Sequence, residues 1–101
     1  MKMEISVVPV SEDGNVAPYL AEMVKIIAAT ELEYKCTPMS LQLSGDKQTA
    51  MDVARQCHEK VMSMTDRAFI RLRMDEANDA SNGFESELKA VEEIVGKKIK
   101  T

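Results

Sequence analysis

The sequence predicts an α+β fold with the order β-α-β-β-α-β, a four-stranded antiparallel sheet and an additional C-terminal helix. Apolar residues alternate with polar ones in short segments, which is the period of a strand, and recur every three or four residues in longer segments, which is the period of a helix. The chain has 101 residues, 45% of them apolar, which fits one globular domain over residues 1–101. This arrangement is ferredoxin-like, with two helices packed on one face of the sheet.

The first half of the predicted fold is a strand, a helix and a β-hairpin. Residues 3–10 form the strand, and apolar side chains on both of its faces are typical of a central strand. Asn15 is expected to cap the helix, which runs to about residue 30. Alternation then resumes over residues 32–36 and 39–44, on either side of a turn at Thr37-Pro38. The apolar stripe of the helix consists of Val16, Leu20, Met23, Val24 and Ile27.

The second half is a long helix, a strand and a last helix. Asp46 is expected to cap the long helix, whose apolar face carries Ala50, Val53, Ala54, Cys57, Val61 and Met64. In the strand over residues 67–75, Ala68, Ile70, Leu72 and Met74 are expected to face the helices, and Phe69, Arg71 and Arg73 the other side. A polar stretch over residues 76–83 precedes the last helix, with Phe84, Leu88, Val91 and Val95 on its apolar face. The other sheet face is open unless the last helix or another subunit covers it, so we expect a pocket or an interface there.

Composition excludes several classes of protein. A net charge of −4 and a pI near 5.0 disfavour binding to nucleic acid, which draws on clustered Lys and Arg. No apolar run reaches the ~18 residues that a membrane span needs, so no membrane association and a cytoplasmic location are expected. Cys36 and Cys57 are far apart and form no C-x-x-C pair, which argues against zinc and disulfides and favours buried, reduced thiols.

Catalytic and metal-binding motifs are not evident, so we expect no enzyme, no catalytic residue, no metal site and no cofactor. His58 follows Cys57 on a helix, where adjacent side chains point about 100° apart, so the two are not a nucleophilic pair. Asp75, Glu76 and Asp79 lack the spacing of a calcium loop and are more simply solvated loop charges. For Arg67, Arg71 and Arg73, a solvated strand face is favoured over an anion site.

The hairpin is the most informative segment for function. Hydroxyl and amide groups beside Met and aliphatic side chains suit a flat, partly polar ligand, and ordinary strand residues with solvated polar groups are an equal alternative on composition. The residues concerned are Tyr34, Thr37, Met39, Leu41, Gln42 and Ser44.

Several segments, in this order and spacing, resemble the small ferredoxin-like thiamine-binding proteins, which bind thiamine or its hydroxymethylpyrimidine moiety. They are Ile5-Ser6-Val7-Val8-Pro9-Val10, Val16-Ala17-Pro18-Tyr19-Leu20, Tyr34-Lys35-Cys36-Thr37-Pro38-Met39, Gly45, His58-Glu59, Leu72-Arg73-Met74-Asp75 and Leu88-Lys89-Ala90-Val91. The resemblance covers nearly the whole chain and implies the same fold.

The chain departs from the pattern of that family at several positions. The family usually has Gly-Thr-x-aliphatic-Glu-Gly where this chain has Ser40-Leu41-Gln42-Leu43-Ser44-Gly45, so a carboxylate is replaced by Ser44. It also tends to have Arg where Ala77 stands and Lys where Glu87 stands. Losing an acidic partner for a cationic ligand removes a charge-assisted hydrogen bond of about 1.5–3 kcal/mol, if that carboxylate faces the ligand.

Three functions compete. The leading hypothesis is a non-catalytic protein that binds thiamine, hydroxymethylpyrimidine or a related heterocycle and forms a homodimer or homotetramer. The alternatives are a structural or regulatory module that self-associates through its open sheet face without a small ligand, and an enzyme that uses His58. The candidate ligand-binding residues are Ser6, Thr37, Met39, Gln42, Ser44 and Arg73.

Overall fold

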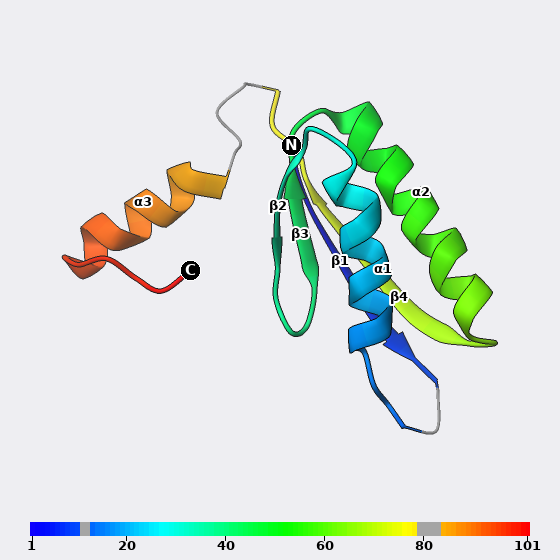
Figure 1. The fold of residues 1–101 in the computed structure, drawn as a ribbon. Coiled ribbons are helices and arrows are strands. Elements are labelled where there is room, and N and C mark those ends of the chain that lie inside the picture. The colour runs from blue at the N-terminus through cyan, green and yellow to red at the C-terminus, as the bar shows by residue number, and fades with distance from the viewer. Residues whose placement is uncertain (11–12, 79–83) are drawn as a thin grey trace.

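A computed structural model describes residues 1–10, 13–78 and 84–101 of the chain. The predicted order of strands and helices and the additional C-terminal helix are confirmed (Figure 1). The elements are β1 (Lys2–Pro9), α1 (Ala17–Ala28), β2 (Glu33–Cys36), β3 (Leu41–Ser44), α2 (Lys47–Met64), β4 (Ala68–Asp75) and α3 (Phe84–Val95).

The four strands form one antiparallel sheet in the order β2-β3-β1-β4. As predicted from its two apolar faces, β1 is a central strand, paired with β3 on one side and along its full length with β4 on the other. This register puts Glu4 of β1 opposite Gln42 of β3 and Arg73 of β4. Since opposite residues of a ladder point to the same face, these three side chains share one side of the sheet.

The hydrophobic core lies between the sheet and the two helices α1 and α2, which both pack on the same sheet face (Figure 1). Every second residue of β1 enters it, and each burial of a large aliphatic side chain contributes about 1.5–3 kcal/mol. The buried residues are Met3, Ile5, Val7, Tyr19, Met23, Ile27, Leu41, Leu43, Ala50, Val53, Cys57 and Val61.

The two predicted helix caps differ in outcome. Asp46 caps α2 as expected: its Oδ2 accepts hydrogen bonds from the backbone N–H and the hydroxyl of Thr49, both at 2.9 Å, and these bonds lower the pKa of Asp46. At α1 the cap residue is Val16, which provides no side-chain bond. Asn15 lies one residue earlier, and its Oδ1 accepts from the N–H of Ala17 at 3.1 Å, so it still satisfies a first-turn donor.

The inward side of β4 faces the helices as predicted but is only partly covered, and the prediction that both thiols are buried is wrong for Cys36. Leu72 and Met74 are 45% and 40% exposed, although they lie on the helix side of β4. The helices cover β1 and β3 and only the beginning of β4, an edge strand, where Ala68 and Ile70 are half-buried. Cys36 is exposed because it ends β2, the other edge strand.

The two free thiols predict a difference in reactivity. Burial raises the pKa of the Cys57 thiol to about 11, so we expect iodoacetamide to label Cys36 of the native protein and Cys57 only after denaturation.

The raised pKa of Cys57 also makes stability depend on pH. Between pH 9.0 and about 11 the unfolded chain loses the Cys57 proton while the folded protein keeps it. The free energy of unfolding therefore falls as pH rises through this range. Denaturant unfolding across this range should show a shallower fall in stability for Cys57→Ala than for Cys36→Ser.

Gly45, which separates β3 from the cap of α2, has a φ of +142°, and a Cβ built on it would lie 2.7 Å from Cδ2 of Leu32. We expect Gly45→Ala to lower the free energy of unfolding by about 1–3 kcal/mol, since both backbone strain and the displaced Leu32 oppose it. Gly14 is the matched control, because its φ is +60° and no atom lies within 4 Å of the added Cβ. Equal losses for the two variants in urea unfolding would contradict the role of Leu32.

Candidate functional site

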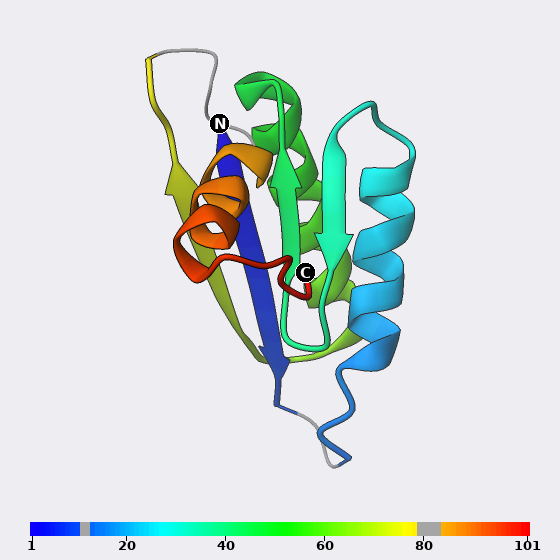
Figure 2. The same ribbon diagram turned by 90° about the vertical axis from the view of Figure 1, so that its left-hand side faces the viewer.

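The candidate site lies on the sheet face that α1 and α2 leave uncovered. In Figure 2, α3 crosses in front of this face, over β1 and β4. No residue of α3 is buried, and two contacts of its first turn connect it to the strands. Lys2 Nζ lies 3.0 Å from Glu87 Oε1 of α3 and 3.3 Å from Asp75 Oδ2 of β4, and Lys35 Nζ lies 5.6 Å from the centre of the Phe84 ring.

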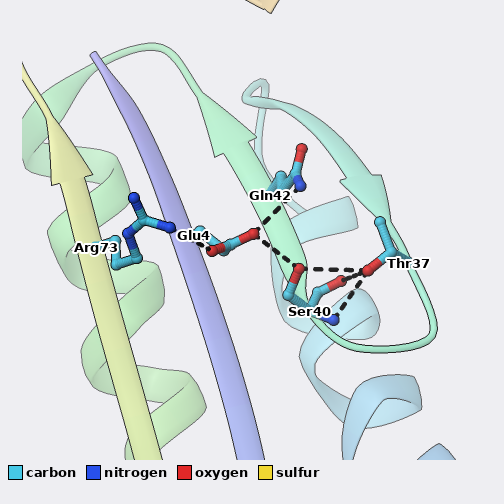
Figure 3. A network of polar contacts seen from close by, with 5 residues as sticks. All are labelled: Glu4, Thr37, Ser40, Gln42 and Arg73. Atoms are coloured by element: carbon cyan, nitrogen blue, oxygen red, sulfur yellow. Dashed lines mark hydrogen bonds and ion pairs between the residues drawn. The ribbon is translucent and has the colours of Figure 1, made fainter. Parts of the chain in front are cut away.

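Glu4 is the centre of a polar network on this face (Figure 3). Its Oε2 accepts hydrogen bonds from Ser40 Oγ at 3.1 Å and from Gln42 Nε2 at 3.3 Å, and its Oε1 lies 3.7 Å from Arg73 Nη1. Thr37 Oγ1 accepts from the N–H of Ser40 at 3.0 Å, which holds the hairpin turn that carries Ser40. The Glu4 side chain is 35% exposed, so a ligand can reach it while these donors fix its position.

A cavity of about 230 Å³ lies beside this network, between the open sheet face and the start of α3. It combines two carboxylates and two cationic side chains with an amide and an aromatic ring. The cavity therefore offers hydrogen-bond donors, hydrogen-bond acceptors and an aromatic face for stacking. Its lining residues are Lys2, Met3, Glu4, Gln42, Arg73, Met74, Asp75 and Phe84. A smaller polar hollow of about 60 Å³ adjoins it, lined by Glu4, Ser6, Arg71 and Arg73.

The structure brings together only part of the predicted ligand-binding set. Gln42 and Arg73 line the cavity, and Ser6 lines the adjoining hollow. Thr37 is engaged in the hairpin turn, and Met39 is 81% exposed in the same turn. Ser44 is 8% exposed and lines neither cavity.

Sequence reasoning missed Glu4, along with Lys2, Asp75 and Phe84. Glu4 is two residues before Ser6, so the period of two that placed Ser6 on the open face also places Glu4 there. A charged residue in the middle of a central strand is the signal that was available.

The charges at the edge of the cavity reinforce one another. The pKa of Lys2 is raised, chiefly by its hydrogen bond to Glu87, and Asp75 adds to the effect. Lys2 is accordingly protonated throughout the neutral range. The contact between β1 and α3 is lost only as pH rises through this raised pKa, above the ordinary value of 10.5.

Other candidate chemistry lies away from this site. His58 is exposed on α2 and lines a groove on the opposite side of the sheet, while Cys57 is buried in the core, so the two do not form a pair. Within the described ranges, no three His, Cys, Asp or Glu side chains gather closely enough to hold a metal ion. Asp79 of the predicted acidic cluster lies outside the described residues. None of the described helices combines the length and apolar composition of a bilayer span.

The fold and the cavity define a ferredoxin-like protein with a small-molecule-binding role. The sequence profile of the thiamine-binding protein family matches residues 3–92, and the chain belongs to that family. This family is named for binding and not for a reaction.

Curated relatives and solved structures agree with this assignment. A UPF0045 protein of Staphylococcus xylosus is 29% identical over 92% of both chains, and one of Methanothermobacter thermautotrophicus is 25% identical over 91% of this chain and 96% of its own. A hypothetical protein of Methanocaldococcus jannascii shares the fold with a TM-score of 0.82 at 26% identity, over 91% of this chain and 95% of its own. A Thermotoga maritima protein, proposed to serve in thiamine biosynthesis or salvage, has a TM-score of 0.67 at 21% identity, over 92% of this chain and 99% of its own.

The ion pair between Lys2 and Glu87 predicts how α3 is held over the cavity. Glu87→Gln removes the charge that Lys2 contacts, and an exposed pair of this kind contributes about 0.2–1 kcal/mol. We expect amide hydrogen exchange in α3 to accelerate by about 1.5- to 5-fold. Glu93→Gln is the matched control, the same change at an exposed position of the same helix. Equal exchange rates in the two variants would contradict the role of this ion pair.

Proposed function

We propose that the protein binds thiamine, its hydroxymethylpyrimidine moiety or a closely related amino-bearing heterocycle in the cavity between the open sheet face and α3. The observation that carries the proposal is Glu4, a carboxylate on a central strand that is held by two donors and faces the cavity. Family membership and the Thermotoga maritima neighbour support a ligand of the thiamine type.

Recognition would rest on hydrogen bonds at one end and stacking at the other. The Glu4 carboxylate accepts from an exocyclic amino group or a protonated ring nitrogen, a charge-assisted bond that contributes about 1.5–3 kcal/mol. The Gln42 amide both donates and accepts, so it can serve a second ring position. The Phe84 ring lies on the α3 side of the cavity and offers a face for a flat heterocycle.

The size of the cavity favours the smaller ligand. Pockets that enclose drug-sized molecules are about 300–1,000 Å³, and this one is about 230 Å³. A single pyrimidine ring suits that volume better than the two rings of thiamine. Binding of the complete vitamin would require α3 to move outward, which its lack of buried residues permits.

A binding role without catalysis follows from the chemistry of the lining. Among the described residues, no thiol, imidazole or Ser–His pair lines the cavity, and the titratable groups in its lining are Lys2, Glu4, Arg73 and Asp75. The carboxylates among them already have cationic partners, Arg73 for Glu4 and Lys2 for Asp75. We therefore propose that the protein captures and releases its ligand without converting it.

A thermal-shift titration with hydroxymethylpyrimidine and with thiamine tests the proposal. At 100 times its dissociation constant a ligand adds about 2.7 kcal/mol, which for a domain of this size raises Tm by roughly 10–20 °C. We expect a saturable rise, larger for the pyrimidine than for thiamine at equal concentration. A folded protein whose Tm is unchanged by either compound would refute this ligand class.

Glu4→Gln tests the role of the carboxylate within that site. The variant keeps the shape of the side chain and loses its charge, so we expect the dissociation constant to rise at least tenfold by calorimetric titration, which corresponds to about 1.4 kcal/mol. Glu59→Gln on α2, whose partner is Arg55, is the control and should bind as the unmodified protein does. Binding that survives in Glu4→Gln would place the ligand elsewhere.

A further inference from the structure

We propose that the polar hollow beside the ligand cavity binds a phosphoryl group, so that the preferred ligand is the phosphate monoester of hydroxymethylpyrimidine and not the free compound. This inference rests on the proposed function and deepens it, because it assigns the chemical class of the ligand that the same site takes. The hollow has a volume of about 60 Å³ and is lined by Glu4, Ser6, Arg71 and Arg73.

The register of β1 and β4 brings the two arginines of the hollow together. Ser6 lies opposite Arg71 in this ladder, and Glu4 lies opposite Arg73, so all four side chains are on the open face of the sheet. Arg71 and Arg73 are two residues apart on one strand, which makes them neighbours on that face. An anion between two neighbouring cations reduces their mutual repulsion.

The charges of the lining favour an anionic group. The two arginines supply two positive charges and Glu4 supplies one negative charge, so the hollow is positive overall. Arg73 Nη1 lies 3.7 Å from Glu4 Oε1 (Figure 3), and no carboxylate of the described residues pairs with Arg71. The Arg73 side chain is 76% exposed, and a guanidinium group has five N–H donors, so several remain for a ligand.

The size and the donors of the hollow suit a phosphoryl group. A cavity needs about 10–15 Å³ to admit one water molecule, so this hollow admits a group with several oxygen atoms. A guanidinium group donates two parallel hydrogen bonds to a phosphate, and the Ser6 hydroxyl can donate another. A phosphate monoester carries a charge of about −1.5 to −2 at pH 7, which compensates both arginines. The donors that already hold the Glu4 carboxylate reduce its repulsion of the ester.

The position of Glu4 decides which phosphate ester fits. Glu4 and Arg73 line both the cavity and the hollow, so they form the border between the two. In hydroxymethylpyrimidine the amino group and the hydroxymethyl arm are on neighbouring ring carbons. When the amino group binds Glu4, a phosphoryl group on this arm therefore lies next to the hollow. In thiamine phosphate the thiazolium ring separates the phosphoryl group from the pyrimidine, so that ester gains less from the arginines.

The structure separates the three arginines in and before β4. Composition favours a solvated strand face for all three. Arg67 agrees with that interpretation, since it lines neither the cavity nor the hollow and its guanidinium lies 5.3 Å from the centre of the Phe69 ring. Arg71 and Arg73 differ because they share the hollow with a hydroxyl group. Arg67 is therefore the matched control for Arg71.

Inorganic phosphate tests the hollow without the pyrimidine. Added at constant ionic strength, it should shift the side-chain Nε–H resonances of Arg71 and Arg73 saturably, and that of Arg67 much less. Constant ionic strength matters because salt screens the contacts of exposed charges that have no defined site. Shifts of equal size at all three arginines, or no shift at Arg71 and Arg73, would overturn the phosphoryl site.

Calorimetric titration with hydroxymethylpyrimidine and with its phosphate monoester tests the complete inference. We expect the ester to bind at least tenfold more tightly, and this ratio to fall toward one in Arg71→Gln but not in Arg67→Gln. Circular dichroism confirms that each variant is folded. The corresponding ratio between thiamine phosphate and thiamine should be smaller, and a larger one would overturn the choice of the pyrimidine ester.

The outcomes of this titration distinguish the inference from the proposed function. Equal affinities for hydroxymethylpyrimidine and its ester, or a ratio that Arg71→Gln leaves unchanged, would overturn the phosphoryl site while the proposed function stands. A protein that binds neither of these compounds nor thiamine would refute the proposed function, and this inference with it.

Discussion

The pairing of β1 with a neighbour on each side is the constraint on which the rest of the structure depends. Because side chains of a strand alternate between faces, β1 sends Met3, Ile5 and Val7 into the core and Lys2 and Glu4 to the opposite face. The same backbone hydrogen bonds therefore hold the core and the candidate site in place. A slip of one residue would bury the charges and expose the core side chains.

The two faces of the sheet are stabilised by different interactions. On the helix side, buried aliphatic and Met side chains supply the stabilisation, since no position of that core bears a charge. On the open side, α3 has no buried residue, and the contacts that the described residues make between α3 and the strands are one ion pair and one cation–π contact, each of small energy. A rigid sheet beneath a weakly held helix suits a site that must admit and release a ligand.

Much of the fold was predictable because local patterns and tertiary packing agree. The alternation in β1, the stripe of α2 and the Asp46 cap each appear in the structure as expected. The site was less predictable. Residue type and strand position predicted Gln42, Arg73 and Ser6, which line the cavity and its adjoining hollow, whereas Thr37 and Met39 belong to a turn whose hydrogen bonds the sequence does not reveal. The position of Glu4 on the open face follows from the period of β1, but the donors that hold its carboxylate come from other parts of the chain and could not be predicted.

The sequence by itself determined the order of elements, the family and the inward face of each strand, since these depend on periodicity and on residues close together in the chain. Only the tertiary structure decided that β4 is an edge strand, which leaves Leu72 and Met74 exposed. It also decided that Glu4 meets Ser40, Gln42 and Arg73, residues at least 36 positions away in the chain. Strand order and register set these contacts. Both depend on burying the apolar surface of all four strands together, which no single segment of the sequence specifies.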